Sequence, residues 1–195
     1  MAQLLALLAF SFVSSFTPGP NNILLWASGA TFGFRRTVPH VLGTALGIGA
    51  MALVAGAGVA ALVASVPQLG VAMRLAGSIY LVWLAWQIMR SGALREGSVA
   101  RPMGVGGATA FQVLNPKAWI FALGAVTTFR PAELPVFAGT VVVALAMMSM
   151  VVPTAAAWAG AGGVMGRWLS GEWTRRVLGV VLGLMILGTI VLVWL

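Results

Sequence analysis

The sequence predicts an all-α integral membrane protein of six transmembrane helices, arranged as two inverted repeats of three. Three observations support this prediction. First, 61% of the 195 residues are hydrophobic and 7% are charged, whereas about 25% of residues in a soluble globular chain are charged. Second, the basic residues lie in short segments between apolar runs that are long enough to cross a bilayer. Third, proline motifs interrupt the first and fourth runs. We expect one integral membrane domain over residues 1–195, with repeat halves of about 1–100 and 101–195.

The first span is expected from about Leu4 to Ala30, and a proline motif breaks it. Residues 1–34 carry no charge, and no basic residue precedes the run, so we interpret it as a span and not as a signal peptide. The break and the polar residues after it are Pro18, Gly19, Pro20, Asn21 and Asn22. Backbone freed at membrane depth is tolerated where it is buried in protein or lines a polar cavity. A substrate site is therefore favoured over a kink that serves packing alone.

The other five spans follow the remaining apolar runs. They are expected at about Val38 to Ser65, Ala72 to Met89, Gly107 to Thr128, Leu134 to Gly160 and Val177 to Trp194. In the second span, Gly43 and Gly47 form a GxxxG pattern, which predicts close packing against another helix. The fourth span contains a second polar interruption, made by Gln112, Asn115, Pro116 and Lys117. Interrupted spans at corresponding positions of two halves are typical of a transport site.

The distribution of arginine predicts the orientation in the membrane. The first, third and fifth loops carry two, three and three arginines: Arg35, Arg36, Arg90, Arg95, Arg101, Arg167, Arg175 and Arg176. Arg74 and Arg130 are the only arginines near the even-numbered loops. Because positive loops face the cytoplasm, both termini are expected outside.

Lys117 is the only lysine of the chain, and it lies within an apolar span. A cation inside the membrane is costly unless it faces a cavity or a partner, although its side chain can also extend to the interface. None of the three acidic residues falls in a predicted span. A substrate carboxylate is therefore an attractive partner for Lys117, and a net-neutral zwitterion is favoured over a cationic substrate.

Composition excludes several classes of function. The chain has no cysteine, one histidine and three acids, so we expect no metal, no cofactor and no catalytic residues. The net charge of +8 is spread over loops, so nucleic acid is not an expected partner. His40, expected near the inner face at the start of the second span, is interpreted as structural rather than as a proton carrier.

The motifs resemble the LysE/RhtB family of amino-acid exporters, most closely its cysteine/O-acetylserine exporter branch. The matching stretches are residues 17–24, 33–35, 76–77, 80–86 and 115–118. The resemblance implies an inner-membrane efflux carrier driven by the proton gradient, with both proline motifs near the translocation path. The lysine-exporting branch usually carries an acid in the second span. This chain has Gly49, Ala50 and Met51 there, which argues against a basic substrate.

Our hypothesis is secondary active efflux of small neutral amino acids or their derivatives, by alternating access and coupled to protons. The residues expected at the substrate are Pro18, Gly19, Pro20, Asn21, Asn22, Gln112, Asn115, Pro116 and Lys117. The alternatives are an exporter of basic amino acids or homoserine lactone-type metabolites, a small channel, and a structural membrane subunit. The expected partners are the amino acid, the proton and the lipid bilayer. The oligomeric state is left open, with a homo-oligomer among the options.

Overall fold

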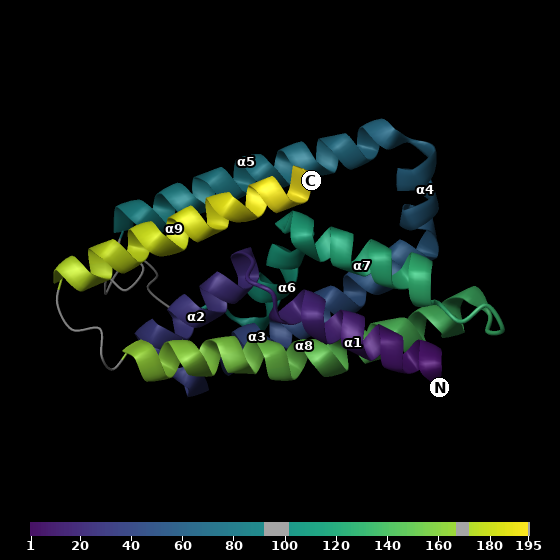
Figure 1. Cartoon of the computed structure of the whole chain (residues 1–195), viewed down its shortest axis with the longest axis horizontal. Coiled ribbons are helices and arrows are strands. Elements are labelled where there is room, and N and C mark those ends of the chain that lie inside the picture. Colours follow the sequence, from purple (N-terminus) through teal and green to yellow (C-terminus); the bar gives the residue numbers. More distant parts are fainter. Residues whose placement is uncertain (92–101, 167–171, 195) are drawn as a thin grey trace.

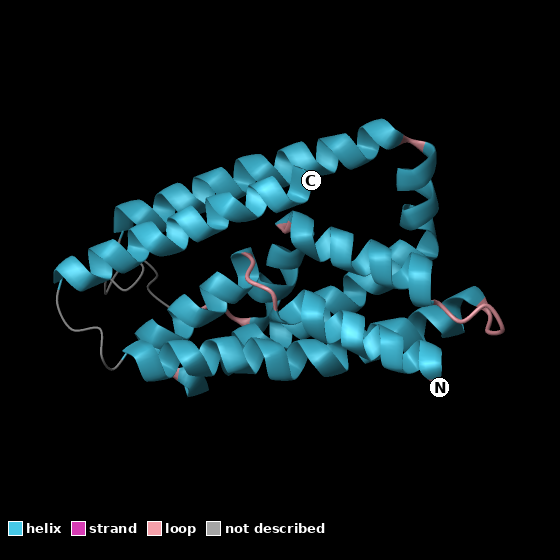
Figure 2. Cartoon of the chain, in the orientation of Figure 1, coloured by secondary structure: helices cyan, strands magenta, loops and turns pink. Residues whose placement is uncertain are grey.

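The computed structural model describes residues 1–91, 102–166 and 172–194, and these residues are helical with short connections (Figures 1 and 2). The all-α prediction is confirmed. The helices are α1 (Ala2–Phe16), α2 (Pro20–Phe32), α3 (Phe34–Val54), α4 (Ala60–Ser65), α5 (Pro67–Ser91), α6 (Val105–Leu114), α7 (Pro116–Phe129), α8 (Val136–Gly166) and α9 (Glu172–Trp194). The loop predictions that concern Arg95, Glu96, Arg101 and Arg167 lie outside the described residues.

Three helical segments in the described ranges are long and apolar enough to cross a membrane: Phe34–Val59, Gln68–Arg90 and Val136–Gly166. A fourth span results if α1 and α2, which meet at a bend of 60°, are counted as one broken segment. Val105–Leu114 and Arg176–Val191 are shorter apolar helices. The chain is therefore a membrane protein by this criterion, and the count of six spans stays a prediction.

The second predicted span is not one continuous α-helix. Gly33 ends α2 with φ of 80°, a value that favours glycine, and α3 begins directly after it at Phe34. A π-helical segment, Ala55–Val59, follows α3, and within it Gly58 has φ of 116°. This kink turns the chain into the short helix α4 (Figure 1).

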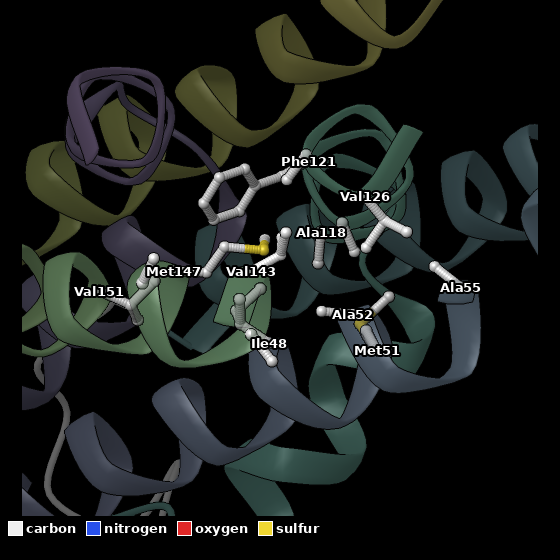
Figure 3. Packing of buried hydrophobic residues seen from close by; sticks show 14 of the residues in the cluster. Ile48, Met51, Ala52, Ala55, Ala118, Phe121, Val126, Val143, Met147 and Val151 are labelled. Carbon is white, nitrogen blue, oxygen red and sulfur yellow. The ribbon is translucent and has the colours of Figure 1, made fainter. Parts of the chain in front are cut away.

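Three packed groups of apolar side chains hold the helices together, and the smallest joins α2, α3 and α8. The first lies between α1, α3, α7 and α8, and Figure 3 shows it around Ile48, Phe121 and Met147. The second lies between α2, α5, α6 and α9. α5 and α9 run side by side along one edge of the molecule (Figure 1).

Glycines let two pairs of helices approach closely. A Cβ on Gly43 would meet the carbonyl of Val105, and one on Gly47 would come within 2.6 Å of Gln112 Cγ, so the GxxxG pattern packs α3 against α6. On the other side of the molecule, a Cβ on Gly162 would collide with the backbone carbonyl of Trp26. α2 and α8 therefore touch backbone to backbone, as expected where small residues line a helix interface.

The contact between α2 and α8 predicts unequal effects of two alanine substitutions in α8. Gly162→Ala should lower the free energy of unfolding by about 1–3 kcal/mol, because backbone must move to make room for the methyl group. Gly160→Ala is the matched control, since a Cβ there meets nothing within 4 Å, and it should be neutral or stabilising by up to about 1 kcal/mol. Thermal melts of the purified variants measure both, and equal melting temperatures would contradict the packing.

Candidate functional site

The first break separates α1 from α2 at residues Thr17, Pro18 and Gly19. Pro20 is the first residue of α2, where its missing N–H costs nothing because that group has no partner inside the helix. Gly19 precedes it in an extended conformation. The two helices diverge by 60°, so the last carbonyls of α1 have no intrahelical donors.

Side chains from three other helices satisfy the carbonyls that this break exposes. From α2, Asn22 Nδ2 donates to Ser15 O at 2.7 Å and to Thr17 O at 2.9 Å. From α8, Trp158 Nε1 donates to Phe16 O at 3.1 Å. From α7, Lys117 Nζ donates to the carbonyls of Thr17 at 2.6 Å and Pro18 at 3.3 Å. Polar side chains of neighbouring helices thus satisfy the backbone carbonyls at the break, and the break is an integral part of the fold.

The second break lies between α6 and α7 at a single extended residue, Asn115. Its Oδ1 accepts a hydrogen bond of 3.2 Å from the backbone N–H of Lys117 and so caps α7, whose first residue is Pro116. Its Nδ2 donates to Gln112 Oε1 at 3.3 Å. Nearby, Trp119 Nε1 donates to Val113 O at 2.9 Å.

Asn21 joins the two breaks. Its Oδ1 lies 2.9 Å from Gln112 Nε2, 3.2 Å from Thr44 Oγ1 and 3.3 Å from His40 Nε2. These four side chains are buried and come from α2, α3 and α6. Buried polar groups in contact with one another form a network that is favourable only if its members are satisfied. A substitution in one helix therefore acts on the other two.

A cavity lies between the breaks. It is lined by Ser14, Ser15, Gly19, Asn21, Asn22, Thr44, Ile48, Gln112, Asn115, Lys117, Ala118, Phe121, Val151, Thr154 and Ala155, and its volume is about 40 Å³. One water needs roughly 10–15 Å³ by this measure, so the cavity holds a few waters. An amino acid has five or more heavy atoms and would need the walls to move apart.

Lys117 closes one side of this cavity. Its stem covers Gly19, where a Cβ would lie 2.7 Å from Lys117 Cδ. Its ammonium group bonds the Thr17 hydroxyl at 2.8 Å in addition to the carbonyls of Thr17 and Pro18. These partners are neutral oxygens, and six helices that supply cavity residues or the break (α1, α2, α3, α6, α7 and α8) contain no aspartate or glutamate.

The structure brings six of the nine predicted site residues to the cavity wall: Gly19, Asn21, Asn22, Gln112, Asn115 and Lys117. The three prolines are not among the lining residues; they start or precede the helices that carry them. The prediction missed Ser15, Thr44 and Thr154, which line the cavity. Thr44 lies one helical turn after His40, and Thr154 follows Pro153, but neither position alone indicates a site.

His40 is buried in the protein. It is 1% exposed, and α3 begins at Phe34, more than a full turn before it; its place near the inner face of the membrane stays a prediction. It does not line the cavity, but it reaches the cavity wall through Asn21.

Comparisons with known proteins find relatives that are named for efflux. Cysteine/O-acetylserine efflux proteins of Escherichia coli strain K12 and Shigella sonnei strain Ss046 are each 33% identical to this chain over 121 residues, and that of Escherichia coli O1:K1 is 32% identical. The matched stretch covers 62% of this chain and 62% of each relative. No solved structure matches the chain.

The family comparison covers more of the molecule. The family described as LysE type translocator matches residues 12–194, a stretch that includes both helix breaks and every residue of the cavity wall. The chain therefore belongs to the family of LysE type translocators, which are transporters and not enzymes.

Proposed function

We propose that this protein exports small neutral amino acids or their derivatives across the bacterial inner membrane, by alternating access and at the expense of a proton gradient. The observation that carries the proposal is the cavity between two facing helix breaks, lined by amide, hydroxyl and ammonium groups. Family membership and relatives named for the efflux of cysteine and O-acetylserine support it.

The proposed arrangement in the membrane has six passes in two inverted halves. In support, Figure 1 shows six successive segments that run in alternating directions along the long axis. Two segments are helix pairs, α1 with α2 and α6 with α7, and the other four are the single helices α3, α5, α8 and α9. Both breaks lie near the middle of that axis (Figure 2). Arginine in the odd-numbered loops favours a cytoplasmic position for those loops and places both termini outside.

The substrate class follows from the charges at the cavity. A cationic substrate would need a fixed carboxylate, and the cavity-forming helices contain none. A zwitterion, by contrast, can bind Lys117 and also replace the hydrogen bonds that Lys117 gives up. Its carboxylate takes the lysine ammonium, and its own ammonium takes the carbonyls of Thr17 and Pro18 that the lysine leaves. The positive end of the α7 helix dipole is also favourable for the carboxylate.

Alternating access requires the cavity to open on one side at a time. At about 40 Å³, the cavity represents the closed arrangement, and the hinges proposed are the two breaks, where the chain is not held by intrahelical bonds. A channel is the competing function. Purified protein in lipid vesicles, given radiolabelled O-acetylserine and an imposed pH gradient, should show saturable transport that stops when the gradient is abolished. Non-saturating flux independent of the gradient would indicate a channel.

Asn21→Ala should reduce gradient-driven transport at least about tenfold, because it removes the acceptor that Gln112, Thr44 and His40 share. Gln112 and Thr44 keep the carbonyls of Ala108 and His40 as partners, but His40 Nε2 is left without one, and an unsatisfied buried group costs roughly 1–3 kcal/mol. Ser149→Ala is the control, since the Ser149 hydroxyl bonds only the carbonyl of Ala146 in its own helix. Initial rates in vesicles with equal amounts of protein measure the effect. Transport by Asn21→Ala at the wild-type rate would show that this hydrogen-bond network has no part in transport.

Lys117→Met should weaken transport of a free amino acid about tenfold and remove most of its advantage over the carboxyl methyl ester, because methionine keeps an apolar stem on Gly19 but offers no cation. The comparison is made by competition of O-acetylserine and its methyl ester against labelled substrate. Arg74→Met serves as the control, because Arg74 is an exposed cation that does not line the cavity. Equal losses for acid and ester would show that Lys117 does not bind the carboxylate.

A further inference from the structure

His40 holds the one titratable side-chain atom, among the buried atoms of the described residues, that has no hydrogen-bond partner. This atom is Nδ1; the other buried atom without a partner is Ser11 Oγ. Nε2 lies 3.3 Å from Asn21 Oδ1, which is an acceptor, so Nε2 carries the hydrogen and Nδ1 presents a lone pair. The ring is therefore connected to the cavity wall on one side and free to take a proton on the other.

The helices around His40 offer no charge that would neutralise an imidazolium. Of the elements packed against α3, helices α2, α6 and α8 and the π-helical segment contain no titratable side chain. α7 contributes Lys117, and α3 itself carries Arg35 and Arg36 in its first turn. All three are cations. A second ring proton would thus place an N–H group without an acceptor in a buried site, which is costly.

We propose that His40 carries the coupling proton of transport and binds it at Nδ1; this inference rests on the proposed function. When the site opens outward, water reaches Nδ1, an N–H bond forms there and the ring becomes an imidazolium. When the site opens inward, the same bond breaks and the proton returns to water. The ring is neutral while the substrate crosses toward the outside and protonated while the empty site returns, so the proton moves only with the conformational change.

Asn21 transmits the state of the ring to the substrate. A charged imidazolium makes a stronger hydrogen bond from Nε2 to Asn21 Oδ1 than a neutral ring does. That bond competes with the one from Gln112 Nε2, which reaches the same oxygen at 2.9 Å. Because Asn21 and Gln112 both line the cavity, proton and substrate bias the same groups, as reciprocal coupling between two sites requires.

Lys117 is the other titratable side chain at the site, and its geometry suits a different role. Its N–H donors already reach the Thr17 carbonyl, the Thr17 hydroxyl and the Pro18 carbonyl. Loss of its proton would break bonds that close the first helix break. His40 can gain a proton without losing a bond it has.

His40→Gln separates proton coupling from structure, because glutamine can still donate to Asn21 Oδ1 but takes up no proton. In vesicles, exchange of labelled for unlabelled O-acetylserine should stay within about twofold of wild type, since exchange needs no proton step. Net transport driven by a pH gradient should fall at least about tenfold. Thr189→Val, which removes a buried hydroxyl of α9 away from the cavity, should leave both activities unchanged.

Retained gradient-driven transport in His40→Gln would overturn the inference. So would an equal loss of exchange and net transport in a variant that melts like wild type, because His40 would then only position Asn21. If wild-type protein does not transport O-acetylserine, or transports it without a gradient, the proposed function itself fails, and this outcome is seen before any variant is made.

A second measurement does not depend on the variant. His40 is the only histidine, so ¹⁵N-histidine labelling of the wild-type protein in lipid nanodiscs gives the NMR signals of this ring alone. At a pH where the ring is partly protonated, saturating O-acetylserine should displace the Nδ1 proton and move that signal toward its unprotonated position. No response of the ring to O-acetylserine would overturn the coupling role.

Discussion

The structure depends on one constraint: a helix broken among apolar side chains must find donors for the carbonyls it exposes. The end of α1 meets this requirement with Asn22 from α2, Trp158 from α8 and Lys117 from α7. Three helices are thereby tied to a single short segment of backbone. The hydrogen bonds that stabilise the break also fix the positions of α2, α7 and α8 around the cavity. The same contacts therefore determine both the fold and the site.

The amide network adds a second level of dependence. Gln112 reaches Asn21 because α6 lies close to α3, and α6 lies close because Gly43 and Gly47 leave no side chain between the helices. Asn115 orients the amide of Gln112 by donating a hydrogen bond to its Oε1, and it also caps α7. A chain of contacts thus runs from helix packing to the groups that face the cavity.

The sequence alone predicts those features whose causes are local. Pro18 to Pro20 and Asn115 to Lys117 stand out because proline and glycine act on their own stretch of backbone, and α2 and α7 do begin at Pro20 and Pro116. The kink at Gly58 was not predicted, whereas α8 runs through Pro153 without a break, where the sequence predicted none. A glycine permits a positive φ without requiring it, and a proline within a long helix is tolerated when its surroundings compensate.

The residues that sequence reasoning missed are set by long-range packing. Ser15 and Thr154 are 139 positions apart and meet across a 3.0 Å hydrogen bond; a single sequence contains no signal for such a pair. The burial of the His40 side chain is set in the same way, by the helices that pack against α3. Packing also decides which charges surround the cavity, and this bears on the proposed exchange at Lys117. In a closed cavity without carboxylates, a zwitterion can replace the lysine's bonds one for one, whereas a substrate with a single charge leaves either the ammonium or the carbonyls without a partner.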